Sequence, residues 1–110
     1  MDQSLTRESP LICDLSALDS AQRARHQANT GQLFGSVEEI EELADGYAFR
    51  LPAEAATLVK AAEFMTLERL CCPFFNFALE LEREGGPLWL KMTGREGVKQ
   101  FLLAEVGLQR

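Results

Sequence analysis

The chain has 110 residues, of which 46% are hydrophobic and 25% charged, a composition typical of one ordinary globular domain. Acidic residues outnumber basic ones by 17 to 11, and no Lys/Arg cluster offers the footprint that nucleic acid requires, so we expect no nucleic-acid partner. No apolar run approaches the roughly 20 residues that cross a bilayer, and the polar start MDQSLTRESP lacks the apolar core of a signal peptide. We therefore expect a cytoplasmic protein without a membrane partner.

The N-terminal region predicts an arm followed by a helix. Residues 1–12 show little periodicity, and we expect a flexible N-terminal arm before a single domain of residues 13–110. Ser16, with Asp19 three positions later, indicates an N-cap with an Asp variant of the capping box, opening a helix through about residue 30. Four small residues at spacings of three and four predict a stripe for close approach to a neighbouring element: Ala17, Ala21, Ala24 and Ala28.

Two hairpin patterns enclose a long helix. Asp45-Gly46 is a strong signal for a two-residue turn, and such a turn would place Glu41 opposite Arg50. Good helix formers then follow Pro52 up to the pair Cys71-Cys72. Alternating segments on either side of Gly85-Gly86-Pro87 predict the second hairpin, and a closing helix follows it. The order predicts an α+β fold, with a helix and two hairpin/helix units forming a four-stranded antiparallel sheet with helices on one face.

The stretch ERLCCPFF places two adjacent cysteines one helical turn after a carboxylate. Glu68 is therefore within reach of both Cys71 and Cys72. A helix C-terminus disfavours a thiolate, and a disulfide between neighbouring cysteines would be strained. The total of three cysteines is odd, which in a reducing compartment argues against a disulfide framework and for free thiols or ligands.

These cysteines suggest a metal site. Cys71 and Cys72 together with Cys13 could form a three-sulfur site for a soft metal ion such as zinc or mercury, or for a metalloid. His26 is a candidate fourth ligand to zinc, and Glu68 a partner of the ligands, although one histidine beside two arginines is ordinarily a solvated surface residue. A metal-binding domain of this kind would not need to be an enzyme.

Two alternatives stay open. The first is a thiol redox or nucleophilic cysteine protein, with His26 as the base for a cysteine nucleophile. The second is an interaction module, expected as a homodimer, in which the cysteines pack as small hydrophobic residues.

Several segments carry a family resemblance. CDLSALDSAQRARH, DGYAFRLP, ERLCCPFFNFALELE and GGPLWLKMTGREGVKQFL resemble a family of small uncharacterised bacterial proteins marked by a Glu-x-x-Cys-Cys-Pro-Phe core. Similar domains occur beside regulators of the mercury-resistance type, which implies a preference for metal over redox chemistry and a regulatory protein as partner. No established activity comes with the resemblance, whose pattern matches Cys13, Glu68, Cys71, Cys72, Pro73 and Phe74.

Overall fold

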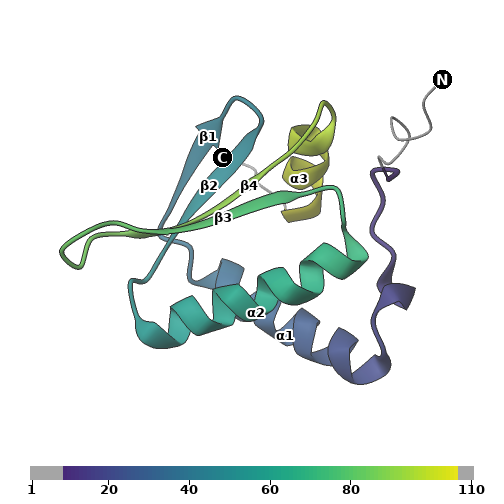
Figure 1. Cartoon of the computed structure of the whole chain (residues 1–110), viewed down its shortest axis with the longest axis horizontal. Helices are drawn as coiled ribbons and strands as arrows, with labels where there is room; N and C mark the ends of the chain where they lie inside the picture. Colours follow the sequence, from purple (N-terminus) through teal and green to yellow (C-terminus); the bar gives the residue numbers. More distant parts are fainter. Residues whose placement is uncertain (1–8, 107–110) are drawn as a thin grey trace.

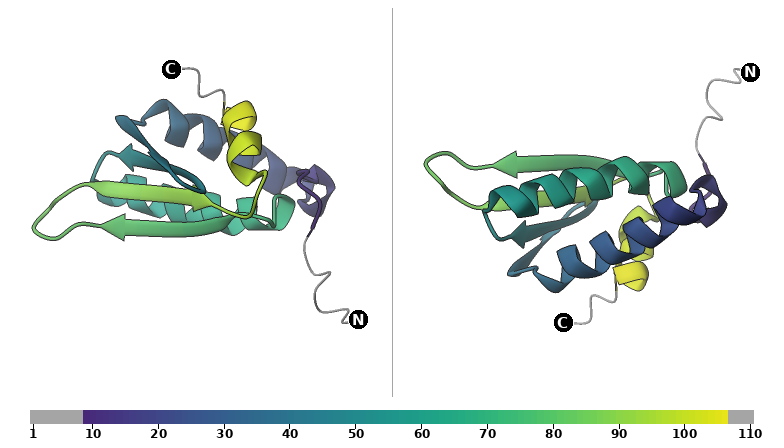
Figure 2. Two further views of the ribbon diagram at one scale, coloured as in Figure 1. Left: turned by 90° about the horizontal axis from the view of Figure 1, so that it is seen from above. Right: turned by 90° about the horizontal axis from the view of Figure 1, so that it is seen from below.

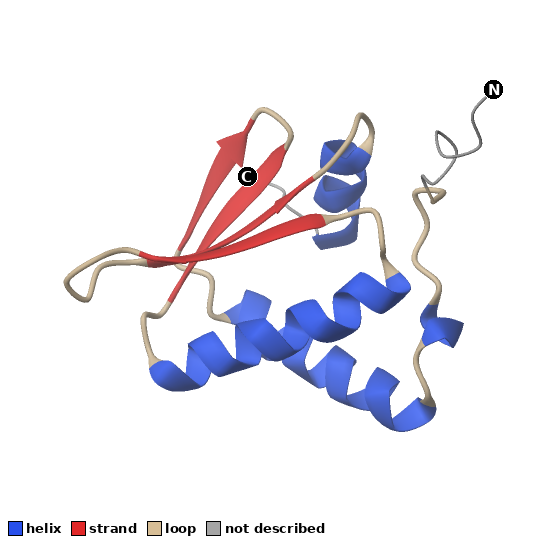
Figure 3. Cartoon of the chain, viewed as in Figure 1, coloured by secondary structure: helices blue, strands red, loops and turns tan. Residues whose placement is uncertain are grey.

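The fold is the predicted α+β arrangement of helices and one antiparallel sheet. In this computed structural model, residues 9–106 are described. Figure 1 follows the chain by colour, and Figure 3 separates helices from strands. In chain order the elements are a short 3-10 turn η2 (Leu15–Ala17), α1 (Ser20–Gly35), β1 (Glu39–Leu43), β2 (Gly46–Leu51), α2 (Ala55–Cys71), β3 (Asn76–Leu81), β4 (Leu88–Thr93) and α3 (Val98–Val106).

The sheet has the strand order β1-β2-β4-β3, with each neighbouring pair antiparallel. Helices α1 and α2 lie beneath one face of this sheet, and α3 lies at its end (Figure 1, Figure 2). Alternate residues of β4 supply the core side of the sheet, because Leu88, Leu90 and Met92 are buried and the residues between them are half-buried. The predicted alternation in this strand therefore holds.

The first hairpin turns one residue earlier than predicted. Leu43 pairs with Gly46, and Glu39 rather than Glu41 lies opposite Arg50. The predicted pairing of Glu41 with Arg50 is therefore wrong, and Arg50 forms an ion pair with Glu39 instead, with Glu39 Oε1 and Arg50 Nη1 3.4 Å apart. Gly46 is the first residue of β2. Only glycine fits there, because a Cβ would lie 2.0 Å from the carbonyl oxygen of Met92. The glycine is thus explained by close approach of two strands and not by the turn.

Helix α1 has a different cap and a different buried face from those predicted. Asp19 is its N-cap and forms a capping box with Gln22, whereas Ser16 lies in the preceding 3-10 turn, which Asp14 caps. The helix continues to Gly35, beyond the predicted end. The alanines of the predicted stripe within it are exposed, because the face toward the core carries larger side chains: His26, Asn29 and Leu33.

The N-terminal arm is described from residue 9 onward, and the part of the predicted arm before it lies outside the described residues. Leu11 packs against the core, and the carbonyl oxygen of Ser9 accepts a hydrogen bond from the guanidinium of Arg95. No helix in residues 9–106 has the length and apolar character needed to span a membrane.

Candidate metal and thiol site

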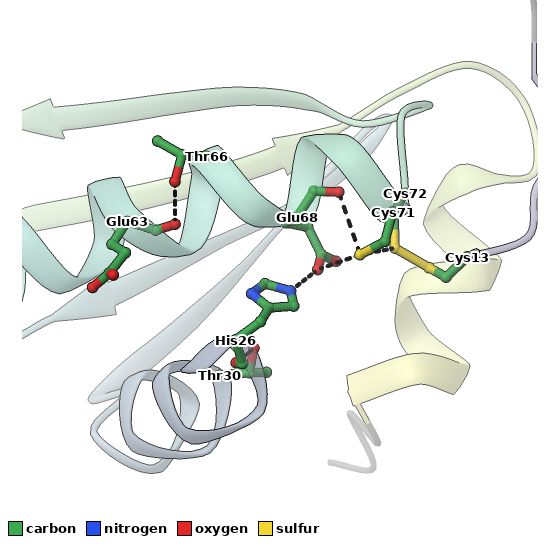
Figure 4. A network of polar contacts seen from close by, with 8 residues as sticks. All are labelled: Cys13, His26, Thr30, Glu63, Thr66, Glu68, Cys71 and Cys72. Atoms are coloured by element: carbon green, nitrogen blue, oxygen red, sulfur yellow. Dashed lines mark hydrogen bonds and ion pairs between the residues drawn. A yellow bond between two sulfur atoms is a disulfide. The ribbon is translucent and has the colours of Figure 1, made fainter. Parts of the chain in front are cut away.

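Three donor side chains meet where α1 crosses the C-terminal part of α2. Glu68 and Cys71 lie one turn apart on α2, and His26 reaches them from α1 (Figure 4). His26 Nε2 is 2.6 Å from Glu68 Oε1, and Cys71 Sγ is 3.9 Å from the same oxygen. The nitrogen, oxygen and sulfur atoms all lie within 4.8 Å of one another.

His26 is buried, so the prediction of a solvated surface histidine is wrong. It is 6% exposed, and its ring stacks on Phe64 with centroids 5.3 Å apart. Its Nδ1 atom is buried without a hydrogen-bond partner in the described part of the chain. Such an unpaired buried nitrogen is uncommon, and here the ring is fixed by stacking and by the contact of Nε2 with Glu68. The spacing of His26, Asn29 and Leu33 along one helix face is the signal that could have indicated this burial.

The structure brings all three cysteines together but joins two of them. Cys13 and Cys72 form a disulfide, whereas Cys71 is a buried free thiol whose Sγ lies 3.7 Å from that of Cys72. The expectation that the chain holds no disulfide is therefore wrong. A backbone hydrogen bond of 2.8 Å from Asp14 N to the carbonyl oxygen of Cys71 holds the arm beside the end of α2 and positions Cys13 against Cys72. The two cysteines are separated by 59 positions in the sequence, and nothing in this spacing indicated the pairing.

The free thiol sits in a negative and poorly hydrated environment. The pKa of Cys71 is raised from 9.0 to about 11, chiefly by burial and next by the Glu68 carboxylate, with a smaller effect from Asp14. Cys71 is therefore a neutral thiol at neutral pH. The same negative potential that disfavours a thiolate would stabilise a cation at this position.

We expect alkylation of Cys71 by iodoacetamide to be slow at pH 7 and to accelerate about tenfold per pH unit toward pH 11, because only the thiolate reacts. Glu68→Gln removes the negative charge beside the thiol, so its alkylation at pH 8 should be faster than in the wild type. Mass spectrometry of the protein with its disulfide intact measures both rates. Glu63→Gln, on the same helix but at a half-exposed ion pair with Arg25, is the matched control and should leave the rate unchanged.

A pocket of about 570 Å³ opens beside the cluster. His26, Glu68 and Cys71 form part of its wall, together with both cysteines of the disulfide. Apolar side chains line much of the remainder: Phe34, Phe64, Phe75, Met92 and Leu102. An apolar pocket with a few converging polar groups is the usual form of a small-ligand site, so the donor atoms are placed where an external ligand can reach them.

Comparison with known proteins adds no relative, since no family model, no curated protein and no solved structure matches this chain. The chemistry of the cluster therefore carries the functional argument alone.

Proposed function

We propose that the domain binds one metal cation of intermediate hardness, such as zinc, through Cys71, His26 and Glu68. The observation that carries the proposal is the convergence of their sulfur, nitrogen and oxygen donors to within 4.8 Å of one another. These are the three donor types that zinc takes in proteins. The proposal keeps the metal-binding function predicted from the sequence and changes the ligand set, because the disulfide removes Cys13 and Cys72 as thiolates.

The electrostatics of the cluster support a cation. Metal binding to a cysteine releases its proton, so the metal replaces the proton that burial and Glu68 now hold on Cys71. The Glu68 carboxylate would also partly neutralise the charge of a bound cation. Without a cation, the same carboxylate destabilises the Cys71 thiolate. The arrangement therefore suits a metal ligand better than a free nucleophile.

The pocket supports an open coordination position. Three protein ligands leave a tetrahedral metal ion one site short, and reactive zinc sites fill that site with water or substrate. In this chain the three donors share a wall of a pocket large enough for a small molecule. The proposed metal would thus be accessible to an external ligand.

Zinc titration of the protein with its disulfide intact tests the proposal. We expect one zinc ion per chain by equilibrium dialysis and elemental analysis, and at least tenfold weaker binding for Cys71→Ser and for Glu68→Gln. Glu63→Gln changes a carboxylate on the same helix outside the cluster and should bind zinc as the wild type does. A wild-type protein that takes up no zinc, or an equal loss in Glu63→Gln, would contradict the proposal.

One observation favours a second candidate function, thiol–disulfide exchange. Cys71 Sγ lies 3.7 Å from Cys72 Sγ, so a Cys71 thiolate could attack that sulfur, form a Cys71–Cys72 bond and release Cys13 as a thiolate. The raised pKa of Cys71 makes this thiolate rare at neutral pH. Rapid alkylation of Cys71 at pH 7 in the experiment above would reverse the preference and favour exchange over metal binding.

A further inference from the structure

We infer that reduction of the Cys13–Cys72 disulfide turns the proposed zinc site into a three-sulfur site for a soft ion, with trivalent arsenic as the chemical class of ligand. This inference rests on the proposed function, because it concerns the same site in a second redox state. Reduction would add two sulfur donors beside Cys71, which is already a thiol.

The three sulfur atoms are already neighbours in the oxidised chain. The disulfide places the sulfurs of Cys13 and Cys72 in bonding contact, and the third sulfur, of Cys71, is 3.7 Å from that of Cys72. Figure 4 shows the three side chains converging from the arm and from the end of α2. Breaking one sulfur–sulfur bond therefore requires only small movements to give three thiols around a common point.

The arm that carries Cys13 has anchors besides the disulfide. On the C-terminal side, Asp14 N donates to the carbonyl oxygen of Cys71, and Leu18 is 2% exposed within the core. On the N-terminal side, Leu11 packs against the same core. These contacts do not involve the disulfide, so we expect Cys13 to stay near Cys72 after reduction.

The chemistry of both steps balances. A phosphine reduces the disulfide with one molecule of water, giving two thiols and a phosphine oxide, so that phosphorus supplies the two electrons. Arsenous acid then condenses with the three thiols, forming three arsenic–sulfur bonds and releasing three molecules of water.

Donor softness explains why the preferred ion would change with redox state. A set of one sulfur, one nitrogen and one oxygen suits a borderline cation such as zinc, whereas a set made only of sulfur selects softer ions. Arsenite needs several thiols at one point, and the oxidised chain has one free thiol among its three cysteines. Opening the disulfide would therefore add arsenite binding to a site that binds zinc in both redox states.

The experiment compares zinc and arsenite binding to the oxidised and the phosphine-reduced protein, each freed of reagent by gel filtration. We expect zinc to bind to both forms. Arsenite should bind only to the reduced form, at one arsenic per chain, and should protect all three thiols from a chromogenic thiol reagent. Reduced Cys13→Ser keeps the zinc ligands and should bind zinc normally, with at least tenfold weaker arsenite binding.

The outcomes separate the inference from the proposed function. An oxidised form that binds no zinc overturns the proposed function, whether or not the reduced form binds it. Zinc binding together with no arsenite uptake, or with arsenite uptake that leaves Cys13 reactive, overturns only the redox inference. If Cys13→Ser does not fold, the comparison of the oxidised and reduced wild-type protein still decides, because it requires no substitution.

Discussion

Cys13→Ser is expected to lower the free energy of unfolding by about 4 kcal/mol relative to the oxidised protein. The disulfide closes a loop between cysteines 59 positions apart, and in the chain-entropy model a loop of this size restricts the unfolded chain by about that amount. Urea unfolding followed by circular dichroism measures the difference. The reference is the same comparison under reducing conditions, in which wild type and variant should unfold at nearly the same urea concentration.

A large difference that persists under reducing conditions would contradict this explanation, because it would mean that Cys13 stabilises the fold by packing and not by cross-linking. The reduced protein should still fold, since most of its core does not depend on the arm. A domain of 110 residues can bury enough apolar surface to be stable without disulfides. The disulfide is then an added constraint on the arm, and this is what allows it to be opened without loss of the fold.

The architecture could be predicted from the sequence because its signals are local. Alternation in Leu88, Leu90 and Met92 specifies which side of β4 faces the core, and Pro73 lies just past the end of α2. Each of these signals depends on residues a few positions apart. The element order and the four-stranded antiparallel sheet follow from them.

The predicted hairpin turn and the predicted N-cap of α1 were wrong because two local signals compete at each of these places. Asp45-Gly46 fits a turn, but Gly46 is needed inside β2, where it meets the backbone of Met92 on the neighbouring strand. Ser16 and Asp19 are both good N-cap residues, and Asp19 becomes the cap because Gln22 completes its capping box. In the first case the contact that decides is between strands distant in sequence.

The residues of the site also differ in how far the sequence could predict them. Glu68, Cys71 and Cys72 could be grouped from the sequence because they share one stretch of helix. The positions of Cys13 and His26 depend on the path of the arm and on the crossing of α1 over α2. The helix-face spacing could have indicated that His26 is buried, but no pattern in the sequence states which residues it meets there. The alanine stripe indicated the wrong buried face of α1, and this error placed His26 on the solvent side of the helix.

Phe64→Ala is expected to lower the free energy of unfolding by about 4 kcal/mol, the usual cost of removing a fully buried phenylalanine side chain. Phe64 is 1% exposed, and its ring contacts that of Phe34 from α1 and that of Phe77 from β3. Its removal therefore leaves a cavity between both long helices and the sheet. Urea unfolding measures the loss, and Val59→Ala, at a position 67% exposed on the same helix, should change stability by less than about 0.5 kcal/mol.

The same substitution also tests how the fold positions the site. The Phe64 ring stacks on His26 with an interplanar angle of 22°, so the cavity should free the imidazole to move away from Glu68. Phe64→Leu fills most of the cavity but removes the stacking surface, and we expect it to keep most of the stability and to weaken zinc binding. Zinc affinity that is unchanged in Phe64→Leu would mean that Glu68 and the helix backbone alone hold His26 in place, and that the aromatic contact serves only the core.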